Sequence, residues 1–334
     1  MKLVMTLVVR DEADVIDDQL AFHLQAGVDF VIATDHRSLD GTTEILESHA
    51  RDGVLQLIRE EGEFIRQSEW QTRMSHLAAT EYGADWVIPS DADEFWWPRG
   101  AHLKEVLSAV PAGYGYVRAL SRNFVPHRDD DGWFAERMTV RLSGQAPIHD
   151  PATPFRPVVK VVHRAHPRAA FRARGGHEMT GLPWPLMRGF HPIEILHVPF
   201  RSAEQCARKY RGAWTGWGEN LRGDLARARA MSDDGRPEAM WHRVSMDEAT
   251  VERGLADGSL VLDLRLRDVL IALRGRRDDA RVLEDARETP FGRPSPAEET
   301  RHAVDASLFD EAEIVRVQRW LDELESRMAR IERR

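Results

Sequence analysis

Short apolar runs alternate with amphipathic stretches along the first hundred residues. Residues 3–9 are almost continuously apolar, which is typical of a strand covered on both faces. Residues 14–26 carry apolar side chains at helical spacing, and Gly27 ends that pattern. The alternation continues with strands expected at 28–33, at 54–58 and from 85 onward, and with helices expected at 42–51 and 67–82. Such alternation predicts an α/β fold with a parallel sheet.

Polar clusters follow three of these expected strands. They lie at 10–12 after the first strand, at 35–40 after the second and at 91–94 after the fourth. In parallel α/β sheets, ligands bind at the carboxyl ends of the strands, near the point where the strand order reverses. The three clusters therefore predict a ligand site at one edge of the sheet.

The rest of the chain is less regular. Residues 103–200 are rich in Pro, Gly, His and Arg, and we expect mixed strands and long loops there, followed by a helix over 202–219. Apolar residues near the C-terminus alternate in steps of three and four, at Ile314, Val317, Leu321, Leu324, Met328 and Ile331. This heptad pattern fits either a helix packed on its own domain or a dimeric coiled coil that would make the protein a homodimer.

These patterns divide the chain into four parts. Residues 1–220 form the expected catalytic domain, with a nucleotide-binding half at 1–100 and an acceptor-facing half at 101–220. A charged helical extension at 221–288 and a linker at 289–298 follow, and an amphipathic helix at 299–334 completes the chain.

Composition narrows the possible functions. The net charge of −9 argues against a nucleic-acid-binding protein, which should carry a clustered basic surface. The single cysteine, Cys206, excludes an intramolecular disulfide and a multi-cysteine zinc site. No stretch approaches the roughly 20 apolar residues of a membrane span, and the first apolar run is too short for a signal peptide. We expect a cytoplasmic protein, with peripheral association at the inner face of the membrane still open.

The sequence Asp91-Ala92-Asp93-Glu94 is the strongest candidate for chemistry. On an extended segment, residues two apart point to the same side, so Asp91 and Asp93 can converge on one ligand. Two facing carboxylates repel each other unless a cation lies between them, and carboxylate oxygens suit Mg²⁺ or Mn²⁺. The motif alone is also common as a solvated acidic turn, but its position at a strand end favours the metal site.

Several segments together resemble a known family. They are 9–14, 23–29, 35–42 and 86–95, in that order and each in its expected strand context, and later 195–202 with Lys209. The resemblance is to the family 2-type glycosyltransferases of the GT-A fold, in particular the branch with an Asp-Ala-Asp-Glu-Phe signature. It covers roughly residues 1–215 and implies a GT-A-like, Rossmann-type mixed sheet flanked by helices, with a helical C-terminal extension.

The resemblance also implies an activity. The protein would be a metal-dependent, inverting glycosyltransferase of the hexosyltransferase type, moving a sugar from a UDP- or GDP-linked donor to an acceptor hydroxyl. Glycan or glycoconjugate synthesis would supply the acceptor. The metal, Mn²⁺ or Mg²⁺, would be held by Asp93 and by the late histidine His197. Asp91 would either bind the same metal or face the ribose. His197 is equally compatible with a purely structural role.

Further donor-binding roles are implied residue by residue. Asp35 would bind the nucleobase, and Arg73 would lie near the donor. The base and ribose pocket would be lined by Val9, Arg10 and Glu12, and the leaving diphosphate would be neutralised by Arg201 and Lys209. The alternatives are ordinary: Asp35 can be a turn or helix-cap residue, and the basic residues can form a solvated helix face.

Inversion requires a general base for the acceptor hydroxyl. Our candidates are Glu178 and His177, because the two preceding glycines permit a close approach. Asp150 and Glu194 remain alternatives. Of the tryptophans, Trp96, Trp97, Trp184, Trp214 and Trp217 are candidates for stacking on sugar rings, although most tryptophans lie in cores.

Rival functions make different demands on the sequence. A sugar-nucleotidyltransferase should have a Gly-rich basic loop after the first strand, whereas this chain has the acidic 10–14. A haloacid-type phosphatase would place Asp-X-Asp after the first strand, and a two-carboxylate glycoside hydrolase would need no nucleotide. A GT-A-like scaffold that binds nucleotide without turnover remains an alternative.

Overall fold

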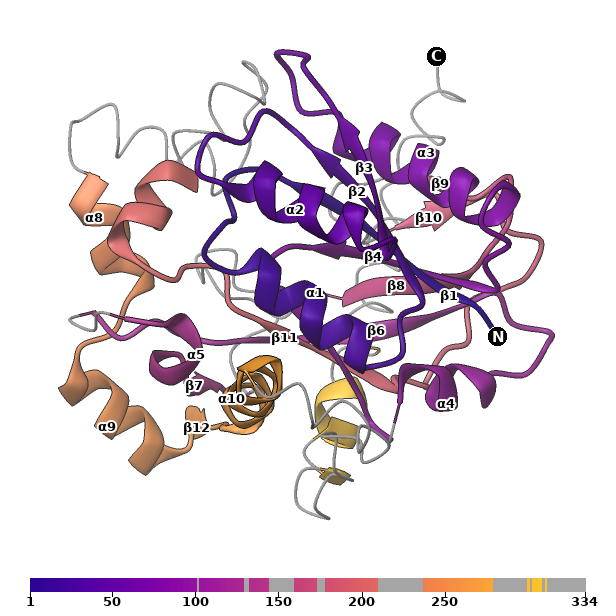
Figure 1. Ribbon diagram of the computed structural model, residues 1–334. Helices are drawn as coiled ribbons and strands as arrows, with labels where there is room; N and C mark the ends of the chain where they lie inside the picture. The colour runs from indigo at the N-terminus through magenta and orange to yellow at the C-terminus, as the bar shows by residue number, and fades with distance from the viewer. Residues whose placement is uncertain are drawn as a thin grey trace, which may run out of the picture.

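The computed structural model describes residues 1–100, 102–128, 132–143, 159–172, 178–209, 237–278, 299–300, 302–307 and 310. Its centre is an eight-stranded sheet with the order β3-β2-β1-β4-β8-β6-β11-β5 (Figure 1). The strands of this sheet are β1 (Leu3–Val9), β2 (Phe30–Asp35), β3 (Leu55–Arg59), β4 (Trp86–Asp91), β5 (Glu94–Pro98), β6 (Tyr116–Asn123), β8 (Val159–Arg164) and β11 (Ile193–His197). Two small sheets pair β9 (Ala170–Phe171) with β10 (Met179–Thr180), and β7 (Val140–Leu142) with β12 (Leu260–Leu262).

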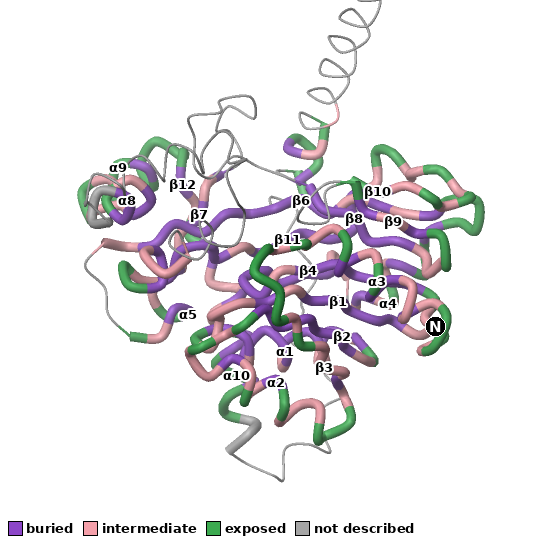
Figure 2. Tube along the Cα trace, turned by 90° about the horizontal axis from the view of Figure 1, so that it is seen from above, coloured by how far each residue is buried: buried purple, intermediate pink, exposed green. Residues whose placement is uncertain are grey.

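The described helices lie around this sheet. They are α1 (Ile16–Gln25), α2 (Thr42–Arg51), α3 (Gln67–Thr80), α4 (Leu103–Ser108), α5 (Phe134–Arg137), α8 (Pro237–Val244), α9 (Glu248–Asp257) and α10 (Arg265–Asp278). Residues 203–209 are also helical. Figure 2 shows the buried strands running through the middle of the molecule, with α1, α2 and α10 together on one side.

Alternating residues of β1 face two different cores. Leu3, Met5 and Leu7 pack in the main core, which also contains Phe22 of α1 and Leu270 of α10. The intervening Val4 packs instead with Ile32, Val87 and Met74, and Met74 comes from α3 on the other face. Both faces of the strand are therefore covered, which explains why its sequence is apolar throughout.

The sheet is mixed, and it opens between β4 and β8. The strands β1 to β4 are parallel, β8 and β5 run in the opposite direction, and β6 and β11 run with β1. The pairing of β4 with β8 is limited to Trp86 and Val87. Pro89, which has no N–H to donate, lies in the part of β4 that is free of β8. Beyond Asp91 the chain turns and enters β5, which pairs with β11.

The α/β class predicted from the sequence is confirmed: a mixed sheet flanked by helices, followed by helices α8 to α10. The helix expected over 202–219 is found at 203–209, and its remainder lies outside the described residues. The linker at 289–298 and the heptad residues from Ile314 onward also lie outside them. The fourfold division of the chain stays a prediction, and α10 shares the main core with the strands. None of the described helices has the length and apolar character needed to cross a bilayer.

Candidate metal and donor site

The candidate residues gather at one edge of the main sheet. The register places Val9 beside Asp35, and Val8 beside Asp91, so that β1, β2 and β4 end together. Since β6 and β11 run in the same direction, their last residues Asn123 and His197, which are register partners, also end at this edge. The clustering predicted from the strand ends is therefore present, and it extends to two strands beyond the first hundred residues.

Asp93 and His197 form the core of this site. The His197 Nε2 atom lies 3.6 Å from Asp93 Oδ1, and its Nδ1 atom lies 2.7 Å from Asn123 Oδ1. The amide oxygen of Asn123 accepts from a protonated Nδ1, and Nε2 is the ring nitrogen that faces Asp93. The other oxygen of Asp93 accepts a hydrogen bond from the Lys209 ammonium, which also donates to Pro199 O at 3.2 Å.

The Asp93 carboxylate is buried and nevertheless charged. Its residue is 3% exposed. Burial works to raise the pKa of Asp93, but Lys209 and His197 outweigh burial and hold that pKa well below its usual value. The pKa of Lys209 is raised in turn, because the attraction of Asp93 and Glu12 outweighs the burial of its ammonium. Asp93 is thus a buried anion that requires a cation.

Asp91 has different partners. Its Oδ2 atom accepts from Lys160 Nζ at 2.7 Å, and its Oδ1 atom accepts from Gln67 Nε2 at 2.9 Å. The same Lys160 ammonium lies 2.7 Å from Glu94 Oε2. Lys160 comes from β8, and its ammonium contacts Asp91 at the end of β4 and Glu94 at the start of β5.

The extended conformation predicted for the acidic motif, with Asp91 and Asp93 on the same side, is wrong. Residues 92 and 93 form a turn rather than an extended segment, and this turn directs the two carboxylates to different cations. Among the residues that the structure describes, no group of three or more His, Cys, Asp or Glu side chains lies close enough to hold a metal. Asp93 and His197 face each other without Asp91, and the roles of all three residues as metal ligands stay predictions.

Glu94 completes the Lys160 cluster. Burial raises the pKa of Glu94 to about 7, against the opposing attraction of Lys160. Its Oε2 atom accepts from the backbone N–H of Asp91 at 3.1 Å, which closes the turn. Glu94 therefore stabilises the conformation of the acidic motif.

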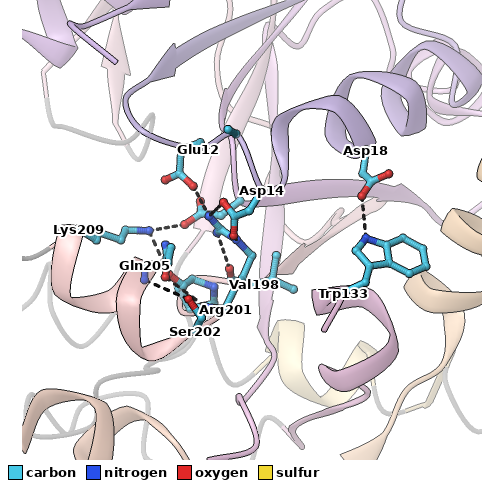
Figure 3. Close-up of polar contacts among 12 residues, drawn as sticks. Glu12, Asp14, Asp18, Trp133, Val198, Arg201, Ser202, Gln205 and Lys209 are labelled. Atoms are coloured by element: carbon cyan, nitrogen blue, oxygen red, sulfur yellow. Dashed lines mark hydrogen bonds and ion pairs between the residues drawn. The ribbon is translucent and has the colours of Figure 1, made fainter. Parts of the chain in front are cut away.

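Arg201 ties the loop after β1 to the segment after β11 (Figure 3). Its guanidinium contacts the Glu12 carboxylate and donates to Asp14 at 2.7 and 2.8 Å. A fourth contact reaches Val198 O at 3.1 Å. The residue is 1% exposed, so all of its donors are directed inward. The predicted role of Arg201 in neutralising the diphosphate is not supported by these contacts, because two carboxylates already occupy the guanidinium.

The loops after β1 and β2 interlock. Asp11 N donates to Ser38 Oγ at 3.0 Å, and Leu39 N donates to Asp11 Oδ1 at 2.7 Å. Asp35 accepts from Ser38 Oγ at 2.6 Å and from Thr43 Oγ1 at 2.5 Å. Both Asp35 oxygens therefore have partners within the turn, as the structural alternative for this residue predicts. Its contact with a nucleobase stays a prediction.

Three further donor-site candidates are Val9, Arg10 and Arg73. The Val9 side chain is buried in the main core, so it does not line an open pocket. Arg10 lies 3.6 Å from the Asp11 carboxylate. Arg73 pairs with Glu60 at 2.6 Å and lines two surface pockets on α3, one of which also contains Phe64 and Trp70. Through Glu60, which follows β3 and bonds to Asp35 O, Arg73 lies near the ends of β2 and β3, and its contact with a donor stays a prediction.

One of the two candidate bases lies within the described residues. His177 is outside the described residues, whereas Glu178 is exposed beside β10. Ala169 O contacts His76, and Phe171 N donates to Thr72 Oγ1 at 3.0 Å, so β9 packs against the middle of α3. Gln67, the first residue of α3, is the one that contacts Asp91.

Of the two alternative bases, Glu194 lies within the described residues. Asp150 lies outside the described residues. Glu194 is buried beside Arg122 and Arg265, at 2.8 Å from each. Burial works to raise the pKa of Glu194, but His302 and these two arginines hold it well below its usual value. Glu194 is therefore a structural anion and not a general base.

Sequence analysis missed Lys160 and Asn123. A lysine flanked by valines on both sides was a usable signal, because a charge inside an apolar strand requires a buried partner. Asn123 offered no such signal. Trp96 and Trp97 were candidates for sugar stacking, and both are buried in the main core.

The chain has structural similarity to several known glycosyltransferases. No protein-family model matches it, and no curated protein matches it. Among solved structures it is similar to Mycobacterium tuberculosis glucosyl-3-phosphoglycerate synthase with Mn²⁺, UDP and phosphoglyceric acid, at 18% identity and a TM-score of 0.27. That alignment covers 36% of this chain and 43% of the synthase, so the chain spans less than half the length of that relative.

A second similar structure is Staphylococcus aureus TarS 1–349 with UDP-GlcNAc, at 13% identity and a TM-score of 0.34, covering 86% of this chain and 91% of that chain. A third is the bifunctional glycosyltransferase WbbM, at 10% identity and a TM-score of 0.25, and the alignment covers 35% of this chain and 23% of that chain. These TM-scores are too low to carry an argument, so a function has to be argued from the residues of this chain.

Proposed function

We propose that this protein is a metal-dependent, inverting glycosyltransferase that moves a sugar from a UDP- or GDP-linked donor to a hydroxyl of a carbohydrate or glycoconjugate acceptor. The observation that carries the proposal is the Asp93–His197 pair at the common carboxyl edge of β1, β4, β6 and β11. A parallel-strand edge is where α/β proteins bind nucleotides. The order of motifs along the first hundred residues supports the same assignment.

The pair fits a divalent cation. Two bonds of about 2.1 Å can bridge the 3.6 Å between Asp93 Oδ1 and His197 Nε2. The hydrogen-bonded Asn123 is the kind of outer partner that orients a metal-bound histidine. Mg²⁺ and Mn²⁺ commonly take one or two protein ligands and complete their coordination with water and substrate phosphates. When bound, the ion would supply positive charge for the departing diphosphate.

The chain's own residues supply the rest. Lys209 offers a cation beside Asp93, and Arg201 holds Glu12 in place next to it. Lys160 fixes Asp91 and Glu94, so the turn that carries Asp93 is rigid. We assign Asp35 and Arg73 to the donor, as the resemblance suggests. We assign Glu178 or His177 to the deprotonation of the acceptor hydroxyl, because the two glycines before them permit a close approach. Catalysis in the cytoplasm, with or without association at the membrane face, is part of the same proposal.

A donor panel tests this function. Purified protein is incubated with UDP- and GDP-sugars and Mn²⁺, and the released nucleoside diphosphate is measured. Asp93→Asn should lower release at least about 100-fold, because a charged group at the reacting phosphates is removed. The matched control is Asp85→Asn, which lies at the opposite end of β4 and is 57% exposed at its side chain. Undiminished release by Asp93→Asn would refute the proposal. Nucleotide binding by the wild type without any release would instead favour a scaffold.

A further inference from the structure

Lys209 holds the Asp93 carboxylate on the side opposite His197. The ammonium contacts Asp93 Oδ2, whereas His197 Nε2 faces Oδ1. The two oxygens belong to one buried anion, so any cation held between Oδ1 and Nε2 would share that anion with Lys209. Two cations on one carboxylate repel each other most strongly in a buried setting.

Lys209 differs from the other cations nearby in how readily it can leave. Its side chain is 37% exposed, whereas Arg201 is 1% and Lys160 is 2% exposed. It contacts the acidic site through one carboxylate and one backbone carbonyl, Pro199 O. Its long flexible stem can move the ammonium to a nearby anion without a change in the backbone.

We propose that Lys209 and a divalent cation compete for Asp93, so that the chain's own ammonium closes the metal site until a nucleoside diphosphate draws Lys209 away. The inference rests on the proposed function, because it assumes that Asp93 binds a metal. In the closed form, Lys209 neutralises Asp93. In the loaded form, the metal neutralises Asp93 and Lys209 pairs with the diphosphate.

The competition has a measurable consequence. If the site is open in about one molecule in ten, the apparent affinity for the metal falls tenfold. Removing the ammonium should restore that affinity. The wild type should therefore bind Mn²⁺ weakly alone and more tightly with UDP or GDP, and part of this coupling should depend on Lys209.

The full chain is titrated with Mn²⁺ alone, and free Mn²⁺ is measured by its electron paramagnetic resonance signal. The same titration is then repeated in the presence of UDP or GDP. Lys209→Met should bind Mn²⁺ about tenfold more tightly than the wild type without nucleotide, and UDP should enhance its affinity less. Lys209→Arg keeps the charge and should behave like the wild type. Arg208→Gln is the matched control. Arg208 pairs with Glu204 at 3.0 Å on the same helix, and replacing it removes one positive charge, as Lys209→Met does.

The outcomes separate this inference from the proposed function. Equal or weaker Mn²⁺ binding by Lys209→Met, with binding lost in Asp93→Asn, would overturn the competition alone. Unchanged Mn²⁺ binding in Asp93→Asn would overturn the metal site itself. If Lys209→Met folds poorly, the rise in its melting temperature on adding Mn²⁺ decides the question: it should exceed that of the wild type, and a smaller rise would contradict the inference.

Discussion

Replacing Arg201 with alanine should destabilise the fold more than it weakens donor binding. The guanidinium is buried between Glu12 and Asp14, and it also holds the backbone at Val198. Removing one partner of a buried ion pair costs about 3–5 kcal/mol, because the remaining charge is left without compensation. We expect a loss of this size in the free energy of unfolding.

The loss should also depend on pH. Burial already raises the pKa of Glu12, and Arg201 is the first group that opposes this effect. Without Arg201 the pKa of Glu12 rises further. When a carboxyl has a higher pKa in the folded state than in the unfolded state, the protein loses stability as the pH increases from the unfolded to the folded pKa. The destabilisation of Arg201→Ala should therefore be greater at pH 8 than at pH 5.

Urea unfolding at pH 5 and pH 8, together with calorimetric titration of UDP and Mn²⁺, measures both quantities. Arg208→Ala provides the comparison, since its exposed i,i+4 pair with Glu204 should contribute at most about 0.5 kcal/mol. If Arg201→Ala kept its stability to within about 1 kcal/mol and lost donor affinity tenfold, the guanidinium would be a diphosphate ligand. The structural role assigned to it would then be wrong.

Two further predictions concern buried cations and histidines. Lys160→Met leaves Asp91 and Glu94 without their shared ammonium and should lower the free energy of unfolding by about 3–5 kcal/mol. In urea unfolding the loss should be greater at pH 8 than at pH 6, and an equal loss at both pH values would contradict the assigned contacts. Burial lowers the pKa of His23 to about 3, so the folded state binds fewer protons than the unfolded state below pH 6.5 and loses stability as the pH falls. Between pH 7 and pH 5 the wild type should lose about 2 kcal/mol relative to His23→Gln, and parallel pH profiles of the two proteins would refute this.

The first half of the fold could be predicted because its local signals agree with its tertiary environment. The apolar run at 3–9 became β1 with the same bounds, since both faces of that strand are covered. The helix expected at 42–51 likewise became α2. The positions of the candidate residues at the strand ends followed directly from these elements.

The contacts within the site could not be predicted in the same way. The motif at 91–94 was expected to be extended, but the chain changes neighbours there, from β1 beside β4 to β11 beside β5. That change depends on where β8 and β11 lie in the sheet, which no local pattern records. Arg201 was expected to face a ligand, and its actual partners could not be predicted, because Glu12 and Asp14 lie almost 190 positions away in sequence.

The opening of the sheet between β4 and β8 explains why one acidic motif carries two kinds of cation site. Lys160 reaches Asp91 and Glu94 from inside the sheet and is almost fully buried, so its ammonium cannot exchange with solvent ions. Lys209 reaches Asp93 from outside, and its side chain is partly exposed. Because the turn at residues 92 and 93 separates these two approaches, Asp91 can serve the fold while Asp93 remains available to a cation that arrives and leaves. The exchange of ions proposed for Asp93 would therefore leave the ion pairs of Lys160 with Asp91 and Glu94 in place.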